Sequence, residues 1–516
     1  MDPSLPALAG LPAHALRAPD ALALRAPDAT RRAVVDLGSN SVRLVVFEGG
    51  GRNPVPIFNE KAVLRLGRGL QASGRLNEEG VAQALTVMHR YHAVAAAMGA
   101  ERFEVLATAA ARDASNGPAF IEGLRARMPG VPITILSGEE EASLAAEGLV
   151  CGIPDADGLL ADIGGGSLEL VRLERGARTR MRTLRLGVIR LAERAGGDAA
   201  KARGIVEADL AGEGWVEECA GRDLYCVGGA WRALARIHIA QTNYPLTMVH
   251  HYTIGRDEAR DLAALMAAAG KRQLERLPGV SRRRLDDLPF AAMVLRRLLR
   301  VSGVRRVVFS ANGLREGWYM RQVSAAQRAE DPLLAAGHDY ARRFARDMAL
   351  PPGLIGWTAA LFPGETAEAR RQREAACWMS DIGSRDHPEY RAEQAFLRIL
   401  RQPGIGLDHP ARAFLGLTLA LRYEAEPEAA FLLPARQLLS PEAAARATIL
   451  GMALRLAYTL SAGTAQLLAG TRLRPGAKLV LELAEGSGVF AGESITRRLD
   501  RLAQALGLEA TTTLAA

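Results

Sequence analysis

Two short segments, VVDLGSNS at residues 34–41 and LADIGGGS at residues 160–167, share one plan and decide how the chain folds. Each is an apolar stretch that ends in aspartate, followed by a glycine-containing turn, small hydroxyl residues and a second apolar stretch. That pattern predicts a strand, a tight turn and another strand. Glycine lets the backbone approach a phosphate closely, and turn amides without a strand partner can bind its oxygens. We therefore expect two phosphate-binding turns that face each other across a cleft.

Strands and helices alternate on either side of these segments. Further strand-like apolar stretches lie at 103–106, 133–136, 225–227 and 307–309. Ser137 follows one of them directly, and Glu140 three residues later completes the capping-box pattern of a helix start. This alternation is typical of mixed α/β architecture and extends to about residue 320. Beyond it, long stretches rich in Ala, Arg, Leu and Glu predict a mainly helical region.

Composition limits the class of protein. The chain has 516 residues, 49% of them hydrophobic and 24% charged, which fits about three folded domains and excludes a wholly disordered chain. No apolar run reaches the ~18–20 residues of a membrane-spanning helix, so no membrane partner is expected. The four cysteines are widely spaced and form no CxxC pair. That spacing favours a reducing compartment, and we expect a cytoplasmic protein.

The charge has two explanations. Lys and Arg number 65 against 57 Asp and Glu, a net charge of +8, yet only four of the 65 are lysine. A GC-rich genome explains the arginine bias. An anionic partner explains the surplus, since planar guanidinium groups bind phosphate oxygens in pairs. Aromatic residues make up 5% of the chain and are not interleaved with the arginine clusters. Stacking on bases is therefore not indicated, and no nucleic-acid partner is expected.

The aspartates that end the two strands suit a metal better than a phosphate. Asp36 and Asp162 by themselves would repel a phosphate, but each is a suitable ligand for Mg²⁺ lying between a carboxylate and a phosphate. Neutral hydrogen-bond donors follow in both turns, namely Ser39, Asn40, Ser41 and Ser167. The two turns thus combine metal ligands with phosphate donors.

These motifs resemble those of the exopolyphosphatase/guanosine pentaphosphate phosphohydrolase (Ppx/GppA) family within the actin-like ATPase superfamily. Five further matches occur in order at 108–116 (TAAARDASN), 137–142 (SGEEEA), 185–187 (RLG), 228–229 (GG) and 313–317 (GLREG). Together the motifs extend the resemblance over about residues 31–320.

The resemblance implies a two-lobed actin-like (ribonuclease H-like) α/β fold with its site between the lobes. It implies Mg²⁺-dependent hydrolysis of terminal phosphates from inorganic polyphosphate or from guanosine pentaphosphate (pppGpp). Glu141 matches the catalytic base, and the metal-binding carboxylates are Asp162, Glu169 and Asp36, which begins the first loop. The positions that match phosphate binding are Ser39, Asn40, Ser41, Arg112, Gly165, Gly166, Ser167, Gly228 and Gly229.

Physical reasoning supports part of this assignment and leaves alternatives open. Glu141 falls in the first turn of a predicted helix, whose N-terminus stabilises the ionised form that a general base needs. The alternative is that Glu140 and Glu141 merely begin a helix. Arg112 either stabilises charge on a phosphate or pairs with Asp113 or Glu104.

Two weaker signals have no single interpretation. Gly228–Gly229 is followed by Ala230 and Trp231, where a hydroxyl residue would be a better phosphate donor, so Trp231 suits packing as well as ligand binding. Arginine clusters lie at 282–284, 296–297 and 305–306. They form either a solvated helix face or the side of a channel that follows a long polyanion.

We expect four parts along the chain: a disordered arm at 1–30, actin-like lobe I at 31–150, actin-like lobe II at 151–324 and a mainly helical HD-like domain at 325–516. HD-type domains bind metal through a His-Asp step, but here Ser380 precedes Asp381. The metal motif is therefore degenerate, and no metal site is expected there. Apolar helix faces in this last domain leave room for a homodimer.

Four functions fit these features to different degrees. We favour an exopolyphosphatase that processively removes terminal phosphates from polyphosphate, because the chain is basic and shows no guanine-specific feature. The first alternative is a pppGpp 5'-phosphohydrolase that uses the same residues. The second is a sensor that binds ppGpp or polyphosphate without hydrolysis. An actin-like sugar kinase or ATPase fits the SNS and GEEEA elements less well.

Overall fold

The computed structural model describes residues 30–280, 282–402, 406–484 and 492–514. The described chain forms two compact units. The first contains the residues up to His238 and Thr253–Arg328, and the second contains Ile239–Tyr252 and the residues from Ala329 onward. The predicted arm at 1–30 lies outside the described residues except for Thr30. The predicted boundaries at 150 and 324 stay predictions. Of the helices in the described ranges, none is both long and apolar enough to cross a membrane.

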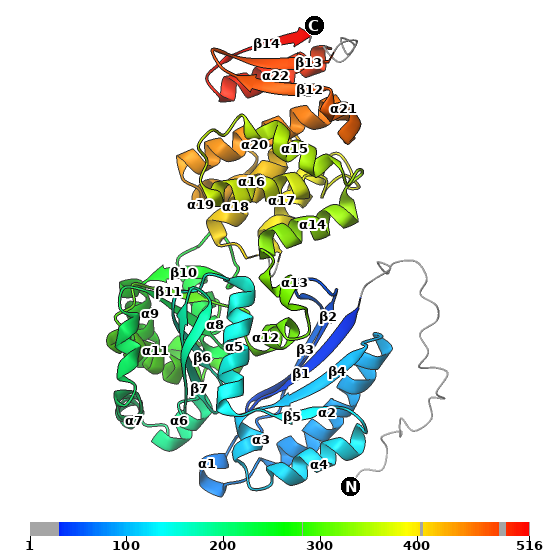
Figure 1. Cartoon of the computed structure of the whole chain (residues 1–516). Helices are drawn as coiled ribbons and strands as arrows, with labels where there is room; N and C mark the ends of the chain where they lie inside the picture. The colour runs from blue at the N-terminus through cyan, green and yellow to red at the C-terminus, as the bar shows by residue number, and fades with distance from the viewer. Residues whose placement is uncertain (1–29, 281, 403–405, 485–491, 515–516) are drawn as a thin grey trace. The chain divides into compact units, whose positions relative to one another are not determined.

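The first sheet of the first unit grows from the strand that contains Asp36, and its strand order is β3-β2-β1-β4-β5. β1 (Arg31–Leu37) pairs antiparallel with β2 (Ser41–Glu48) and parallel with β4 (Arg102–Ala107). β3 (Val55–Val63) and β5 (Ile133–Ile135) complete it, and α1 (Leu70–Ser73), α2 (Glu78–Ala97), α3 (Ala109–Asp113) and α4 (Gly117–Arg127) connect its strands. Asn77 caps α2 by accepting the Gly80 amide at 2.7 Å. We call this sheet and its helices the first lobe (Figure 1).

The second sheet repeats this topology, with strand order β10-β11-β9-β6-β7-β8. β6 (Gly158–Ile163) pairs antiparallel with β7 (Leu168–Glu174) and parallel with β9 (Asp223–Val227), as β1 does with β2 and β4. Its other strands are β8 (Ala177–Leu184), β10 (Tyr252–Gly255) and β11 (Arg306–Phe309). Its helices are α6 (Val188–Ala195), α7 (Ala199–Ala211), α8 (Gly229–Gln241), α9 (Arg256–Ala268), α10 (Lys271–Leu274) and α11 (Leu288–Ser302). This sheet and its helices form the second lobe, and the predicted duplicated α/β pattern is confirmed.

Three edge strands of these sheets, β3, β8 and β10, escaped the sequence prediction because none of them is a continuous apolar stretch. β8 reads ARTRMRTL, and its first six residues are exposed. It lies at the edge of the second sheet, where charged residues protect an unpaired strand from aggregation. β3 is likewise an edge strand of mixed polarity. Edge strands of this kind are fixed by pairing with a neighbour and leave little trace in the sequence.

Two helices between the sheets join the lobes (Figure 1). α5 (Gly138–Gly152) begins with the predicted capping box of Ser137 and Glu140, and it packs against α12 (Leu314–Met320). A Cβ atom on Gly148 would collide with the carbonyl oxygen of Gly313, and one on Gly317 would collide with that of Leu144. The GLREG motif therefore allows two helix backbones to cross in direct contact. A short helix, α13 (Ala325–Ala329), follows.

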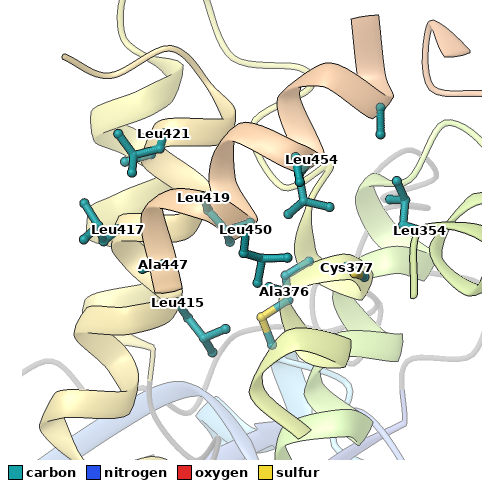
Figure 2. Close-up of a cluster of buried hydrophobic side chains, with 14 of the residues drawn as sticks. Leu354, Ala376, Cys377, Leu415, Leu417, Leu419, Leu421, Ala447, Leu450 and Leu454 are labelled. Carbon is teal, nitrogen blue, oxygen red and sulfur yellow. The ribbon is translucent and has the colours of Figure 1, made fainter. Parts of the chain in front are cut away.

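The second unit is mainly helical, as predicted. Its helices are α14 (Pro332–Phe344), α15 (Leu350–Ala359), α16 (Ala367–Met379), α17 (Arg391–Arg401), α18 (His409–Arg422), α19 (Leu433–Leu438), α20 (Pro441–Ser461) and α21 (Ala465–Ala469). Figure 2 shows Leu415 and Leu419 of α18 together with Ala376, Leu450 and Leu454 in its core, where all five are buried. Its strands and last helix are β12 (Thr471–Pro475), β13 (Lys478–Leu483), α22 (Glu493–Ala505) and β14 (Glu509–Leu514). In the sequence, the apolar stretch 478–483 predicts a strand and the spacing of Ile495, Leu499 and Leu502 predicts a helix, and β13 and α22 confirm both.

Arginines surround Asp381, the aspartate of the stretch that we compared with an HD motif. Asp381 is 3% exposed, and its carboxylate accepts hydrogen bonds from the Arg346 side chain at 2.9 and 3.2 Å. Arg422 lies 3.5 Å away and stacks over the Tyr458 ring. Ser380, where a histidine would stand in an HD motif, shares a 2.8 Å hydrogen bond with the Tyr458 hydroxyl. Guanidinium groups thus neutralise the buried aspartate.

The α5–α12 crossing gives a direct test of the packing. We expect Gly148→Ala to lower the free energy of unfolding by about 1–3 kcal/mol, because the added methyl group forces two helix backbones apart. Gly204→Ala on α7 is the matched control, since a Cβ there meets no other atom within 4 Å. It should stabilise the protein by up to about 1 kcal/mol through helix propensity. Urea unfolding of both variants decides, and equal stabilities would contradict the crossing.

Candidate active site

One cavity of about 170 Å³ lies between the two lobes at the hairpin turns. Twelve of the thirteen residues proposed from the sequence line it: Asp36, Ser39, Asn40, Ser41, Glu141, Asp162, Gly165, Gly166, Ser167, Glu169, Gly228 and Gly229. Arg112 is the exception. We call this space the central cavity.

The two turns meet at the centre of this cavity. The Gly38 amide bonds the Ser41 carbonyl at 3.1 Å, and the Gly164 amide bonds the Ser167 carbonyl at 3.0 Å, so both hairpins close in the same way. A Cβ atom on Gly166 would lie 2.9 Å from the Ser39 hydroxyl of the opposite turn. Any larger residue there would fill the space between the turns, so the glycines of the GGG motif keep the cavity open.

A pair of carboxylates comes from the second lobe. Asp162 and Glu169 are direct cross-strand partners on β6 and β7, so both side chains project from the same face of the sheet. Burial raises the pKa of Asp162 to about 6. Burial, and then the charges of Glu141 and Asp162, raise the pKa of Glu169 well above its usual range. The Glu169 Oε1 atom is buried and has no hydrogen-bond partner among the described residues.

The first lobe places an opposite charge at the equivalent point. Asp36 is the cross-strand partner of Arg43, as Asp162 is of Glu169. Burial raises the pKa of Asp36, although Arg315 and Arg43 act to lower it. Burial, and then the charge of Arg315, lower the pKa of Arg43 to about 10. The duplicated hairpins therefore present an Asp–Glu pair on one side and an Asp–Arg pair on the other.

Five basic side chains line the cavity beside these carboxylates, and we call them the cationic side: Arg43, Lys61, Arg232, Arg284 and Arg315. Among the described residues only Arg284 has an ion-pair partner, Asp287 at 3.0 Å. Burial, followed by the charge of Arg284, lowers the pKa of Lys61 to about 8. Burial, followed by Arg315, lowers the pKa of Arg232 to about 10. Cations that mostly lack ion-pair partners and repel one another can form a site for a multiply charged anion.

Sequence reasoning named Arg284 only as part of the cluster at 282–284 and Arg315 only as part of the GLREG motif, and it missed the other three as site residues. Arg43 and Lys61 lie on two neighbouring strands, as cross-strand partners, and Arg232 and Arg315 lie on helices far apart in the chain. Lysine is rare in this chain, so Lys61 could have been singled out on that ground. Arg43 and Arg232 have no distinguishing local pattern.

Glu141 lies in the first turn of α5 and is 7% exposed. Arg112 donates from Nη1 to its Oε1 atom at 2.9 Å, and the Ser167 hydroxyl donates to Oε2 at 3.5 Å. Burial raises the pKa of Glu141 to about 7; the Arg112 charge lowers it, while Asp36 and Asp162 raise it further. The carboxylate is thus poised between its two protonation states near neutral pH.

Arg112 contacts the site through this glutamate. Its Nη1 atom also donates to the Leu136 carbonyl at 2.7 Å, and its Nε atom donates to Asp113 at 3.3 Å. The alternative pairing with Asp113 is therefore present, whereas Glu104 bonds the Trp318 indole at 2.8 Å instead. In this structure Arg112 orients Glu141 and does not face the cavity.

The glycines at the start of α8 serve close packing around the cavity. Gly228 has φ +109°, and a Cβ there would collide with the Ile163 carbonyl. A Cβ on Gly229 would collide with the Arg284 guanidinium, so this glycine lets Arg284 reach the cavity. Trp231 is fully buried and donates from Nε1 to the Ala291 carbonyl at 2.9 Å. Its role is packing.

Helix α6 of the second lobe holds the first lobe beside the site. Arg190 of α6 is bonded to Asp113 at 2.5 Å, and it is 5% exposed. Glu193, one turn further along α6, accepts the Gly69 amide at 2.6 Å and the Gln71 amide at 3.3 Å. These contacts fix the distance between the two hairpin turns.

The carboxylates of the cavity do not form a ready metal cage. Within the described ranges, no group of three or more His, Cys, Asp or Glu side chains converges closely enough to hold a metal ion. Mg²⁺ does not require one, because it commonly keeps several waters and takes one or two carboxylates together with substrate phosphate. The unpaired Glu169 Oε1, opposite Asp162, suits that mode of binding.

The duplicated lobes with a cavity at their paired hairpins define the actin-like class of folds. The Ppx/GppA phosphatase family profile matches residues 44–326, and a profile described as exopolyphosphatase, C-terminal, matches residues 333–512. The first of these matches covers more than half of the chain. The chain therefore belongs to the Ppx/GppA phosphatase family.

Individual relatives agree with this placement. Exopolyphosphatase 2 of Mycobacterium tuberculosis is 36% identical over 152 residues, which is 28% of this chain and 48% of the relative. The match thus spans about half the length of that protein. Exopolyphosphatase 1 of Mycobacterium bovis is 28% identical over 307 residues, which is 57% of this chain and 89% of the relative. The structure of an exopolyphosphatase from Cytophaga hutchinsonii superposes with a TM-score of 0.53 and 21% identity, and it covers 57% of this chain and 99% of that one. The last comparison shows the fold alone.

The raised pKa of Glu141 predicts a stability effect. Because folding raises this pKa from 4.5 to about 7, the proton is bound more tightly in the folded state, and that stabilisation is lost as the pH rises through about 7. With chelator present, Glu141→Gln should therefore raise the free energy of unfolding at pH 8 by roughly 2–3 kcal/mol and change it little at pH 4.5. Urea unfolding at both pH values measures this. Glu139→Gln, an exposed residue of the same turn, should show no such difference.

Proposed function

We propose that this protein is an exopolyphosphatase, which hydrolyses the terminal phosphate of inorganic polyphosphate. The observation that carries the proposal is that buried carboxylates and basic side chains line the same cavity. Glu141, Asp162 and Glu169 line it together with the cationic side. The names of the mycobacterial relatives support the same activity. Processive removal is the form that we expect for a long polymer.

Glu141 acts as the general base in this proposal. A base works best when its pKa lies near the operating pH, and burial places that of Glu141 at about 7. It takes a proton from a water molecule that attacks the terminal phosphorus, and the bond to the bridging oxygen breaks as the new bond forms. Arg112 keeps the carboxylate aimed at that water through its 2.9 Å contact.

The two hairpin turns bind the phosphoryl group under attack. Ser39 and Ser167 are buried at the turns and offer hydroxyl groups, and the amides of Gly165 and Gly166 add backbone donors. Donors fixed in advance stabilise the charge that spreads over the equatorial oxygens without reorganising during the reaction. The turns therefore hold the phosphorus in line with the water that Glu141 activates.

A divalent cation fits the carboxylate pair of the second lobe. Asp162 and Glu169 would hold Mg²⁺. The negative charge of Asp36 contributes to the raised pKa of Asp162. When bound, Mg²⁺ neutralises charge on phosphate oxygens and thereby reduces their repulsion from the carboxylates. The orphaned Glu169 Oε1 and the raised carboxyl pKa values support this cofactor.

The cationic side binds the rest of the phosphate chain. Arg43, Arg232 and Arg315 carry charge into a space where the described residues provide them no ion-pair partner, and Lys61 and Arg284 extend it. Among the described residues that line the cavity, none is aromatic, so no ring is offered for stacking on guanine. This lining favours an inorganic chain over pppGpp, which remains the alternative substrate.

The second unit has a structural role in this proposal. We infer that it is an HD-like domain whose metal centre has been replaced by the contacts of Asp381 with Arg346 and Arg422. Exposed apolar side chains of this unit, such as Leu433 and Leu467, would also support a homodimer interface in solution.

Substitution of the base tests the proposal. We expect Glu141→Ala to reduce phosphate release from polyphosphate by at least about 10²-fold, the low end of the general-base contribution, while polymer binding is retained. The assay compares polyphosphate, pppGpp and ATP, with and without Mg²⁺, and Glu139→Ala is the exposed control on the same helix turn. Full activity in Glu141→Ala rules out the assigned base. Faster turnover of pppGpp than of polyphosphate selects the alternative substrate.

Lys61 gives a separate prediction for substrate binding. Since its pKa lies at about 8, its charge is present below that pH and lost above it, so KM for short polyphosphate should rise above pH 8. Lys61→Met should raise KM at pH 7 by roughly tenfold or more, because a hydrogen bond to a charged group contributes about 1.5–3 kcal/mol. Lys61→Arg should keep the low KM to higher pH. The exposed Lys271→Met serves as the control, and a KM profile unchanged in Lys61→Met would refute this role.

A further inference from the structure

A second cavity, of about 640 Å³, lies in the second lobe and shares no lining residue with the central cavity. Its volume falls within the roughly 300–1,000 Å³ of ligand-binding pockets. Helices α7, α9 and α11 line it. Six arginines face it, and we call it the arginine cavity: Arg203, Arg256, Arg260, Arg296, Arg297 and Arg300.

These arginines have few counterions. Glu207 is the sole acidic residue among the described residues that line the cavity, and it lies 3.9 Å from Arg297. Arg260 pairs with Asp257 of its own helix at 3.0 Å. Four of the six form no ion pair with a described residue: Arg203, Arg256, Arg296 and Arg300. The lining therefore keeps a large positive charge that the protein does not neutralise.

The spacing of these arginines is unfavourable for the helices that carry them. Arg256 and Arg260 are four residues apart on α9, as are Arg296 and Arg300 on α11. Like charges at this spacing destabilise a helix by about 0.2–0.5 kcal/mol per pair. The Nε atom of Arg297 is in addition buried without a hydrogen-bond partner in the described chain. Unfavourable like-charge pairs and an unpaired buried nitrogen in one place, with no evident gain in stability, are typical of a functional site.

The lining chemistry selects the class of ligand. Guanidinium forks bind pairs of phosphate oxygens, and three helices offer them around a common space. The uncharged lining residues are Val206, Ala267, Met293 and Leu299, and no described lining residue is aromatic. A nucleotide or single-stranded nucleic acid would lack the ring that usually stacks on a base. A chain of phosphates needs only repeated anionic contacts.

We infer that the arginine cavity is a second anion site, which binds a run of linked phosphate groups of inorganic polyphosphate. The inference goes beyond the proposed function and can hold if that function fails, since it concerns binding away from the central cavity. A polymer held at this second point would stay attached to the protein while its end is free.

A methyl resonance inside the cavity reports binding directly. Met293 lines the cavity and is 8% exposed. We would label methionine methyl groups with ¹³C in the full chain carrying Glu141→Gln, so that the ligand is not consumed, and assign the signal with Met293→Leu. Tripolyphosphate and long polyphosphate should each shift the Met293 resonance in a saturable way.

Substitution of the cavity arginines distinguishes binding at this specific site from a general effect of the protein's net charge. Arg296→Ser with Arg300→Ser should raise the Kd for polyphosphate, measured from the shift of the Met293 resonance, by about tenfold or more. The reason is that contacts to charged groups contribute about 1.5–3 kcal/mol each. Arg125→Ser with Arg127→Ser, two exposed arginines of α4 in the first lobe, lowers the net charge equally and should leave the Kd within about twofold. Arg203→Ser on α7 is an independent variant if the first pair fails to fold.

Three results would overturn the inference. One is a Met293 resonance that does not move when tripolyphosphate saturates the protein, which would place all binding elsewhere. Another is equal weakening in the two double variants, which would reduce the effect to net charge. The third is tighter binding of GTP or of a single-stranded oligonucleotide than of polyphosphate of matched charge, which would assign the site to a base-containing ligand.

Discussion

The central cavity depends on one electrostatic constraint: it holds four buried carboxyl groups, which need opposite charge nearby. Asp36, Glu141, Asp162 and Glu169 all have raised pKa values, and burial is the first cause for each. Such an arrangement is unfavourable without opposite charge nearby. The cationic side supplies part of that charge, and a bound divalent cation would supply more. Stability has thus been exchanged for reactivity, as expected where a site departs from the preferences of the fold.

The two lobes use the same hairpin geometry but place side chains of opposite charge in the cavity. Both hairpins end their first strand in aspartate and close through the same amide-to-carbonyl contact. Their cross-strand partners differ, with Arg43 in the first lobe and Glu169 in the second. One difference at equivalent positions therefore gives the cavity a basic side chain from the first lobe and a carboxylate from the second. The topology gives the geometry, and the partner residue gives the sign of the charge.

The parts of this site that the sequence predicts are those with a local signature. Strand-ending aspartates, glycine turns and the capped start of α5 are each determined within a few residues. The family resemblance then implies that Glu141 and Asp162 share one site, and both line the central cavity. The cationic side could not, because Arg232 and Arg315 become neighbours only through the packing of distant helices. Edge strand β8 escaped prediction for a related reason, since its pairing fixes it and its residues do not. The sequence left the role of Trp231 undecided between packing and ligand binding. The hydrogen bond of its buried indole to the Ala291 carbonyl assigns it to packing.

The contacts of α6 bear on which part of a polymer can react. Arg190 and Glu193 bind Asp113 and the Gly69 amide across the lobe boundary, so widening the cleft means breaking an ion pair and a charge-assisted hydrogen bond together. A cleft held in this way resists widening. For the exopolyphosphatase that we propose, this resistance would favour entry of a chain end over binding of the middle of a polymer, without any residue having to recognise the terminus itself.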